Sequence, residues 1–158
     1  MSFKKRNNHF GKKVAVATFK YGGTDSAGVS MNTAAAHGLG VTIPSGALIT
    51  DAYYIVNTTF TSPTTDAATI ALSSGEGAGD LKAAIAISDA TNVWDAGKRG
   101  CLPGHYALDG NALTAIAMSA AEAGSYILTT AERELTATVG VEAITAGELT
   151  LYVEYFVP

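Results

Sequence analysis

The stretch that decides the fold is Leu135-Thr136-Ala137-Thr138-Val139-Gly140-Val141-Glu142-Ala143-Ile144-Thr145-Ala146-Gly147-Glu148-Leu149-Thr150-Leu151-Tyr152-Val153-Glu154-Tyr155-Phe156-Val157. Apolar residues take every second position from 135 to 143, and again from 149 to 157. Because successive side chains of a strand point to opposite faces, this period predicts two strands, each with one buried face. The residues between them include Gly147, which suits a tight turn. The sequence therefore predicts an antiparallel hairpin here.

Three earlier segments also have strand character. Lys13–Tyr21 alternates valine and threonine on one side with alanine and phenylalanine on the other. Ala47–Thr61 is crowded with β-branched and aromatic residues, which favour a pleated and packed surface, and Pro63 follows it. Ala68–Ser73 is a shorter segment of the same kind. We predict a strand in each.

Other segments are less regular. Residues 24–40 lack a period and are interpreted as a long excursion that could contain a helical turn at 34–37, and 94–110 are expected to be irregular. Residues 74–79 are expected to form a flexible loop. Residues 80–88 fit either a helix capped by Asp80 or a buried strand, with the parity of the large apolar residues slightly favouring strand. Residues 113–123 fit either structure.

Strands separated by loops, without regular alternation of strands and helices, predict an all-β fold. We expect an antiparallel β-sandwich or jelly roll with an extended N-terminal arm and at most one or two short helices. The 158 residues suffice for one domain. We therefore divide the chain into a basic arm with the first strand, residues 1–23, and a single β-sandwich domain, residues 24–158.

The charge is strongly polarised along the chain. The first 20 residues hold six of the ten bases and no acid, whereas the remainder holds four bases and fourteen acids, giving +6 and 4 − 14 = −10. An arm of this composition has too few apolar residues to fold alone, so we expect it to contact a partner. The predicted partner-binding residues are Lys4, Lys5, Arg6, Phe10, Lys12, Lys13 and Lys20.

The sequence contains no recognisable catalytic constellation. A Ser-His-acid hydrolase needs a nucleophile beside its base, but His9, His37 and His105 have no Gly-x-Ser-x-Gly elbow near them, and they are interpreted as surface or interface histidines. The single cysteine, Cys101, follows two basic residues, yet a lone cysteine is usually a small packed side chain. We expect a protein that is not an enzyme.

Cofactor and metal sites are not expected either. Residues 75–79 are glycine-rich, but Glu76 and Asp80 would repel a phosphate and no Lys-Ser/Thr pair follows. Asp89, Asn92 and Asp95 could offer oxygen ligands to a cation, although turn-forming hydrogen bonds are the more ordinary role. No zinc spacing is present.

Composition points to protein partners. Charged residues make up 15% of the chain, against about 25% in typical soluble domains, so part of the surface is expected to be covered, most simply in a homo-oligomer such as a dimer or trimer. The acidic body disfavours nucleic acid as the arm's target. No apolar run approaches the ~20 residues of a membrane span, and no apolar stretch follows the N-terminus as in a signal peptide, so synthesis in a cytoplasm is expected.

A resemblance to a known family adds a specific partner. The segments that carry it span 40–157 and are Gly40–Tyr53, Asp80–Ser88, Trp94–Gly97, Arg133–Thr136 and Ala146–Tyr155. In overall pattern they are similar to small virion proteins of tailed bacteriophages, and most resemble capsid cement, or decoration, proteins. The resemblance implies a β-rich, often trimeric structural protein on the outer surface of the phage head, made in the host cytoplasm.

On this resemblance, the chain would decorate and stabilise a capsid by bridging major capsid protein subunits, with the arm as the anchor. The arm itself lies outside the resemblance, so its role follows from its charge alone. The alternative is a carbohydrate-binding jelly-roll module or head-fibre protein, in which exposed Trp94, Tyr106 and Tyr126 would stack on sugar rings.

Overall fold

The computed structural model describes residues 11–101, 107–109, 112–114 and 126–157, and these residues form strands and loops without a helix. The all-β prediction is thereby confirmed. Within the described residues, no helical segment has the length and apolarity needed to cross a bilayer. The strands are β1 (Lys13–Lys20), β2 (Ala36–Ile43), β3 (Leu48–Thr61), β4 (Thr69–Ser73), β5 (Lys82–Ala86), β6 (Gly97–Cys101), β7 (Ala107–Asp109), β8 (Ala112–Thr114), β9 (Ile127–Leu128), β10 (Arg133–Gly140) and β11 (Ala146–Phe156).

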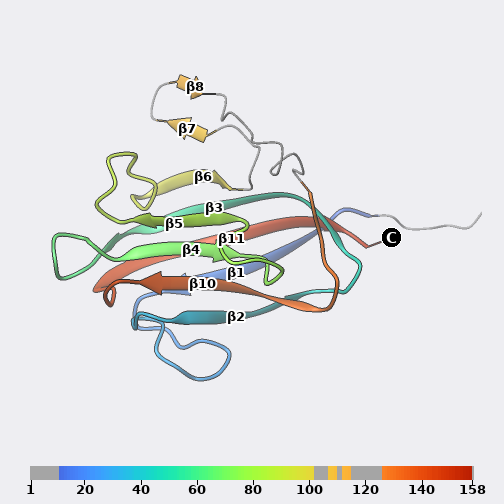
Figure 1. Ribbon diagram of the computed structural model, residues 1–158, viewed down its shortest axis with the longest axis horizontal. Helices are drawn as coiled ribbons and strands as arrows, with labels where there is room; N and C mark the ends of the chain where they lie inside the picture. Colours follow the sequence, from blue (N-terminus) through green and yellow to red (C-terminus); the bar gives the residue numbers. More distant parts are fainter. Residues whose placement is uncertain (1–10, 102–106, 110–111, 115–125, 158) are drawn as a thin grey trace, which may run out of the picture.

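Two antiparallel sheets pack face to face (Figure 1). The β1 sheet has the strand order β1-β11-β3-β6, with β9 also pairing with β3, and the β2 sheet has the order β2-β10-β4-β5. The chain changes sheet at most connections, and its first strand lies beside its last. This double Greek-key path is the jelly roll that the sequence left as one of two options. The short strands β7 and β8 pair with each other and form a separate two-stranded sheet.

The predicted hairpin at 135–157 is wrong, although both of its strands exist. β10 pairs with β2 and β4, whereas β11 pairs with β1 and β3, so the two strands belong to opposite sheets. The segment between them passes from one sheet to the other, and Val141 there has a φ of 72°. The alternation of apolar and polar residues shows that a strand has one buried face, but it does not show which strands are its neighbours.

Gly147 lies inside β11 rather than in a turn. Its φ is 128°, and a Cβ at this position would lie 2.1 Å from Cδ1 of Phe60. The register of β11 against β3 shifts between Ala146 and Glu148, which marks a local irregularity at this residue. The glycine therefore serves close packing of a strand on an aromatic ring.

The structure also corrects several predictions for segments that lack a regular sequence period. The excursion ends earlier than expected, because β2 already begins at Ala36 and no helical turn forms at 34–37. The segment 94–110 contains β6 and β7. Residues 80–88 contain β5, which confirms the preference for strand there. Asp80 does not cap a helix: it accepts hydrogen bonds from the backbone nitrogen and hydroxyl of Ser74 at 2.7 and 2.5 Å and from the backbone nitrogen of Gly77 at 3.1 Å, closing the 74–79 loop. Most of 113–123 lies outside the described residues.

The core lies between the two sheets and is rich in aromatic rings. Phe19 stacks on Phe60 with ring centroids 5.7 Å apart, and Trp94 contacts both Phe60 and Tyr54, at 6.2 and 5.3 Å. All four side chains are essentially inaccessible to solvent. The indole nitrogen of Trp94 donates to the carbonyl of Ile85 at 3.0 Å, so this polar atom is satisfied inside the core.

Part of the predicted arm belongs to this sandwich. Within residues 1–23, Lys13–Lys20 form β1, which pairs over its full length with β11. Ala15, Ala17 and Phe19 point into the core, whereas Val14 and Val16 point outward. The sequence alternation of this strand is thus confirmed, and a deletion of 1–23 would remove a core strand.

Candidate partner-binding surface

The predicted basic site is only partly within the described residues. Four of its members, Lys4, Lys5, Arg6 and Phe10, lie outside them. Lys12 forms an ion pair with Glu154 of β11, with Nζ 2.5 Å from Oε2. Lys13 and Lys20 are exposed at the two ends of β1. The structure therefore places the three described bases at the two ends of the edge strand β1, Lys12 and Lys13 at its start and Lys20 at its end.

The outer face of the β1 sheet carries large apolar side chains that the sequence analysis did not single out. Val14 and Val16 are each 48% exposed. Val16 lies opposite Tyr152, which lies opposite Tyr53. The two tyrosine rings stack with centroids 4.7 Å apart and planes within 10°. Tyr53 also has the Nζ atom of Lys98 4.3 Å from its ring centroid, a cation–π arrangement. These side chains form a continuous row across four strands.

Charges on the same face are balanced. Among the described side chains it carries the bases Lys12, Lys20 and Lys98 and the acids Asp51, Glu148 and Glu154, so its net charge is 3 − 3 = 0. Several of these groups have partners within the chain. Glu148 accepts a hydrogen bond from Asn57 at 3.2 Å, and Asp51 accepts one from the backbone nitrogen of Ala52 at 2.8 Å.

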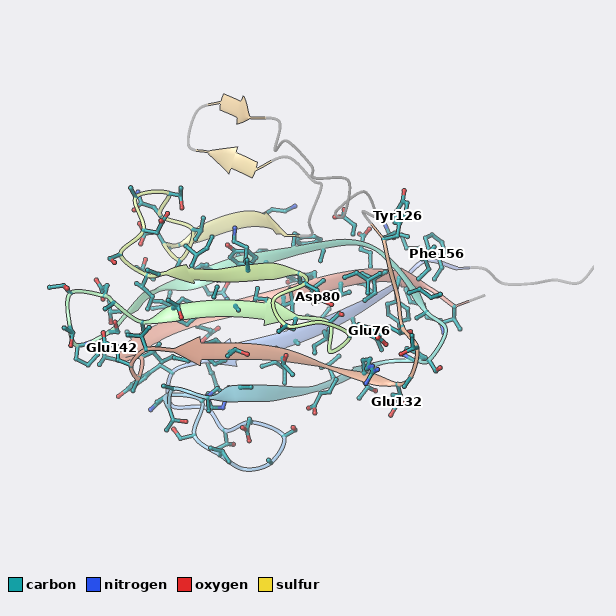
Figure 2. All side chains as sticks on the ribbon, in the orientation of Figure 1. Glu76, Asp80, Tyr126, Glu132, Glu142 and Phe156 are labelled. Carbon is teal, nitrogen blue, oxygen red and sulfur yellow. The ribbon has the colours of Figure 1, made fainter. Side chains whose placement is uncertain are left out.

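An apolar patch continues this face at the end where β1 begins. Phe156 lies opposite Leu48, which lies opposite Leu128 of β9. Leu128 is 59% exposed, and Tyr126, two residues earlier, is 60% exposed. Figure 2 shows Tyr126 and Phe156 at the same end of the sandwich. We call Leu48, Tyr126, Leu128 and Phe156 the end patch. Because the first residue of β1 pairs with Tyr155, β1 begins at this end of the molecule.

The outer face of the β2 sheet is different. Its central positions hold small side chains of threonine, alanine, serine and glycine, with no large apolar residue among the described exposed ones. Cross-strand pairs such as Thr138 with Ala36 and with Ala71 are typical of it. The two broad faces of the sandwich thus differ in chemistry, and the β1 sheet carries the face with large apolar and aromatic side chains.

Loops beside the β2 sheet are closed by carboxylates. Glu76 contacts Arg133 in an ion pair of 2.8 Å and accepts hydrogen bonds from the backbone nitrogen and hydroxyl of Thr130. The hydrogen bond from Arg133 is the largest cause, and the bonds from Thr130 add to it, so that the pKa of Glu76 falls to about 2. Hydrogen bonds from Ser62 and Thr64 lower the pKa of Glu142 in a similar way. Both acids therefore hold loop residues in place through hydrogen bonds.

The candidate chemical residues also have structural roles. His37 is fully buried on β2, contrary to the expectation of a surface or interface residue, with Nδ1 3.1 Å from Asp25 and Nε2 2.9 Å from the carbonyl of Thr33. Asp89 accepts hydrogen bonds from the backbone and hydroxyl of Thr91, as in a turn. Among the described residues, no three His, Cys, Asp or Glu side chains are grouped so that they could hold a metal ion. His9 and His105 lie outside the described residues.

The sugar-stacking aromatics of the alternative are not an exposed set. Trp94 is buried in the core, so the expectation of an exposed ring is wrong. Tyr106 lies outside the described residues, and Tyr126 belongs to the end patch. The sequence did not reveal the burial of Trp94, because the residues around it are polar and lack a period. Its burial depends on Tyr54 and Phe60 from β3.

Comparisons with known proteins yield structural similarity alone. No protein-family model and no curated protein sequence matches the chain. Three solved structures contain a chain of similar fold: "Cyanophage Pam1 capsid asymmetric unit" (TM-score 0.58, 14% identity, covering 100% of this chain and 93% of that chain), "Acidic stable capsid structure of Helicobacter pylori bacteriophage KHP30" (0.56, 13%, 93% and 88%) and "Capsid of Ralstonia phage GP4" (0.53, 13%, 92% and 85%). The chain therefore has the fold of chains found in phage capsid structures.

Proposed function

We propose that this chain is a non-enzymatic structural protein of a phage virion, which decorates and stabilises the capsid by bridging major capsid protein subunits. The observation that carries the proposal is the repeated similarity to chains in three phage capsid structures. In this role the protein sits on the outer surface of the shell. It needs no cofactor, and its partners are the major capsid protein and other copies of itself.

The extent of the structural match supports a separate small subunit. The aligned region covers 85% to 93% of each matched chain. The likeness therefore concerns nearly whole chains and is not confined to one domain of a much longer protein. Asp25 with His37, Asp80 with Ser74 and Glu76 with Arg133 make contacts that hold loops in place, which also suits a role in which binding, and not chemistry, is the function.

The position at which β1 begins supports bridging. Residues Lys4, Lys5 and Arg6 precede β1, whose first residue lies at the end of the sandwich that carries the end patch. Apolar contact at the patch and cationic contact through residues 1–10 can then engage neighbouring parts of one shell. Two linked contacts bind more tightly than either alone, because the second forms at high effective concentration.

The proposal is tested with purified phage shells that lack the protein. Cosedimentation would compare the wild type, a variant lacking residues 1–10, and the triple variant Lys4→Gln, Lys5→Gln, Arg6→Gln. Lys82→Gln, which removes one charge from β5, is the control. We expect saturable binding of wild type and control, and at least about tenfold weaker binding of both arm variants, the change produced by losing ~1.4 kcal/mol.

Two results would contradict different parts of this function. If the wild type fails to bind shells at all, the decorating role is lost. If the arm variants fill the shell with unchanged affinity, the sandwich alone carries the contact, and the arm is not the anchor.

A further inference from the structure

We propose that copies of this chain associate with one another through the outer face of the β1 sheet, centred on Val16, Tyr152 and Tyr53. This interface is independent of the contact with a shell proposed above. It assigns a role to the broad face, whereas the shell contact uses residues 1–10 and the end patch.

The side chains at the centre of this face suit a protein interface. Val14 and Val16 expose about half of their surfaces, and the stacked pair of Tyr53 and Tyr152 lies beside them. Tyrosine is enriched in interface cores, and rings already held by stacking lose little further freedom on binding. A second copy that covers this row would remove apolar surface from water, which is the main driving force of association.

The charge balance of the face favours a second copy over a charged partner. The complete chain has a formal charge of −4, so two copies repel each other in general. The described side chains of this face sum to zero, which makes it a surface where copies can approach without that repulsion. The ion pair of Lys12 with Glu154 and the hydrogen bond of Asn57 to Glu148 leave these acids satisfied when water is excluded.

The face is also large enough. The four strands differ in length, from five residues in β6 to fourteen in β3. With about eight paired residues per strand on average, a strand spacing of about 4.8 Å and a rise of ~3.4 Å per residue, they cover a projected area of roughly 500 Å². Protruding side chains make the accessible area larger than this projection, which brings it near the ~800 Å² per partner of a standard interface. A continuous face of this size can support a stable oligomer by itself.

Pairing through the edge of β1 is disfavoured by comparison. Lys13 and Lys20 are exposed at the two ends of this edge strand. Lysines on an edge strand oppose its extension by a strand of another molecule. The flat face, and not the edge, is therefore the contact between copies.

Sedimentation velocity and equilibrium measurements on the full chain test this interface. The decisive variant is Val16→Glu, which places a carboxylate in the middle of β1, directly opposite Tyr152. Val29→Glu is a matched control, because Val29 is also a valine with 48% exposure but lies in the loop between β1 and β2. Val14→Glu is a second test variant. Far-UV circular dichroism and the thermal midpoint of each variant confirm that it is folded.

We expect the wild type and Val29→Glu to form the same oligomer. Val16→Glu and Val14→Glu should remain folded but dissociate at least about 30-fold more readily, the change that corresponds to the ~2 kcal/mol of an interface hot spot. Two outcomes overturn the proposal. One is a wild type that stays monomeric up to roughly 100 µM, above the dissociation constants usual for interfaces of this size. The other is a Val16→Glu variant that is folded and forms an oligomer of the same mass as the wild type, whether or not it still binds shells.

Discussion

Deleting the N-terminal segment at two different points separates its role in the fold from its role in binding. A variant lacking residues 1–10 loses no member of the described core, whereas one lacking residues 1–23 loses all of β1. The first deletion should therefore leave the sandwich intact, and the second should unfold it. Only the shorter deletion can test the arm as an anchor.

The size of the second effect follows from the packing of β1. Phe19 is fully buried and stacks on Phe60, and truncating such a phenylalanine costs about 3–5 kcal/mol. The deletion also removes buried Ala15 and Ala17, and it breaks the ladder between β1 and β11, whose individual hydrogen bonds each contribute about 0.5–1.5 kcal/mol net. The sum is comparable with the whole stability of a domain, about 5–15 kcal/mol.

Urea unfolding provides the assay. Trp94 is the single tryptophan and is buried, so its fluorescence reports the loss of the core, and far-UV circular dichroism reports the sheets. The variant lacking 1–10 should unfold within about 0.5 kcal/mol of the wild type. The variant lacking 1–23 should show no cooperative transition. A wild-type midpoint for the longer deletion would refute the assignment of β1 to the core.

Three further predictions concern single residues. The pKa of Glu76 is about 2 in the folded protein, below its ordinary value of 4.5, so its contribution to stability is present above pH ~4.5 and lost as the pH falls toward 2. The difference in unfolding free energy between wild type and Glu76→Gln should therefore shrink from pH 7 to pH 3. A constant difference would contradict this. Gly147→Ala should destabilise by at least about 1–3 kcal/mol in urea unfolding, because its Cβ would meet the ring of Phe60; an unchanged midpoint would show that the ring moves away freely. Trp94→Phe should cost about 1–3 kcal/mol by thermal unfolding monitored at the sheets, since the carbonyl of Ile85 loses its donor, and a neutral effect would mean that another donor replaces it.

Much of the local structure could be predicted because its cause is local. The alternation in the last two strands reflects which side chains meet the core, and the structure buries the apolar side of each. Strands also form at Lys13–Lys20 and Leu48–Thr61 as predicted, although the sequence did not show that Ala15, Ala17 and Phe19 would form the buried side of the first. The strand at 82–86 was weakly indicated for the same reason. The polarised charge is likewise a property of the sequence itself.

The candidate surface was only partly predictable. The bases of β1 could be named from the sequence, but the row of Val16, Tyr152 and Tyr53 could not, because its members are brought together by the pairing of β1, β11 and β3. A usable signal did exist: tyrosine and valine occupy outward positions of strands where polar residues are usual for a water-facing sheet.

The sequence by itself determined that the chain is built of strands, that each strand has one buried side, and that the basic residues precede the acidic body. Only the tertiary structure decided which strands are neighbours: β10 and β11 are adjacent in sequence yet lie in opposite sheets. It also decided that Trp94 is core and that Gly147 accommodates Phe60. The physical reason is that alternation encodes the distance of a side chain from the core, whereas strand partners depend on contacts between residues far apart in the chain.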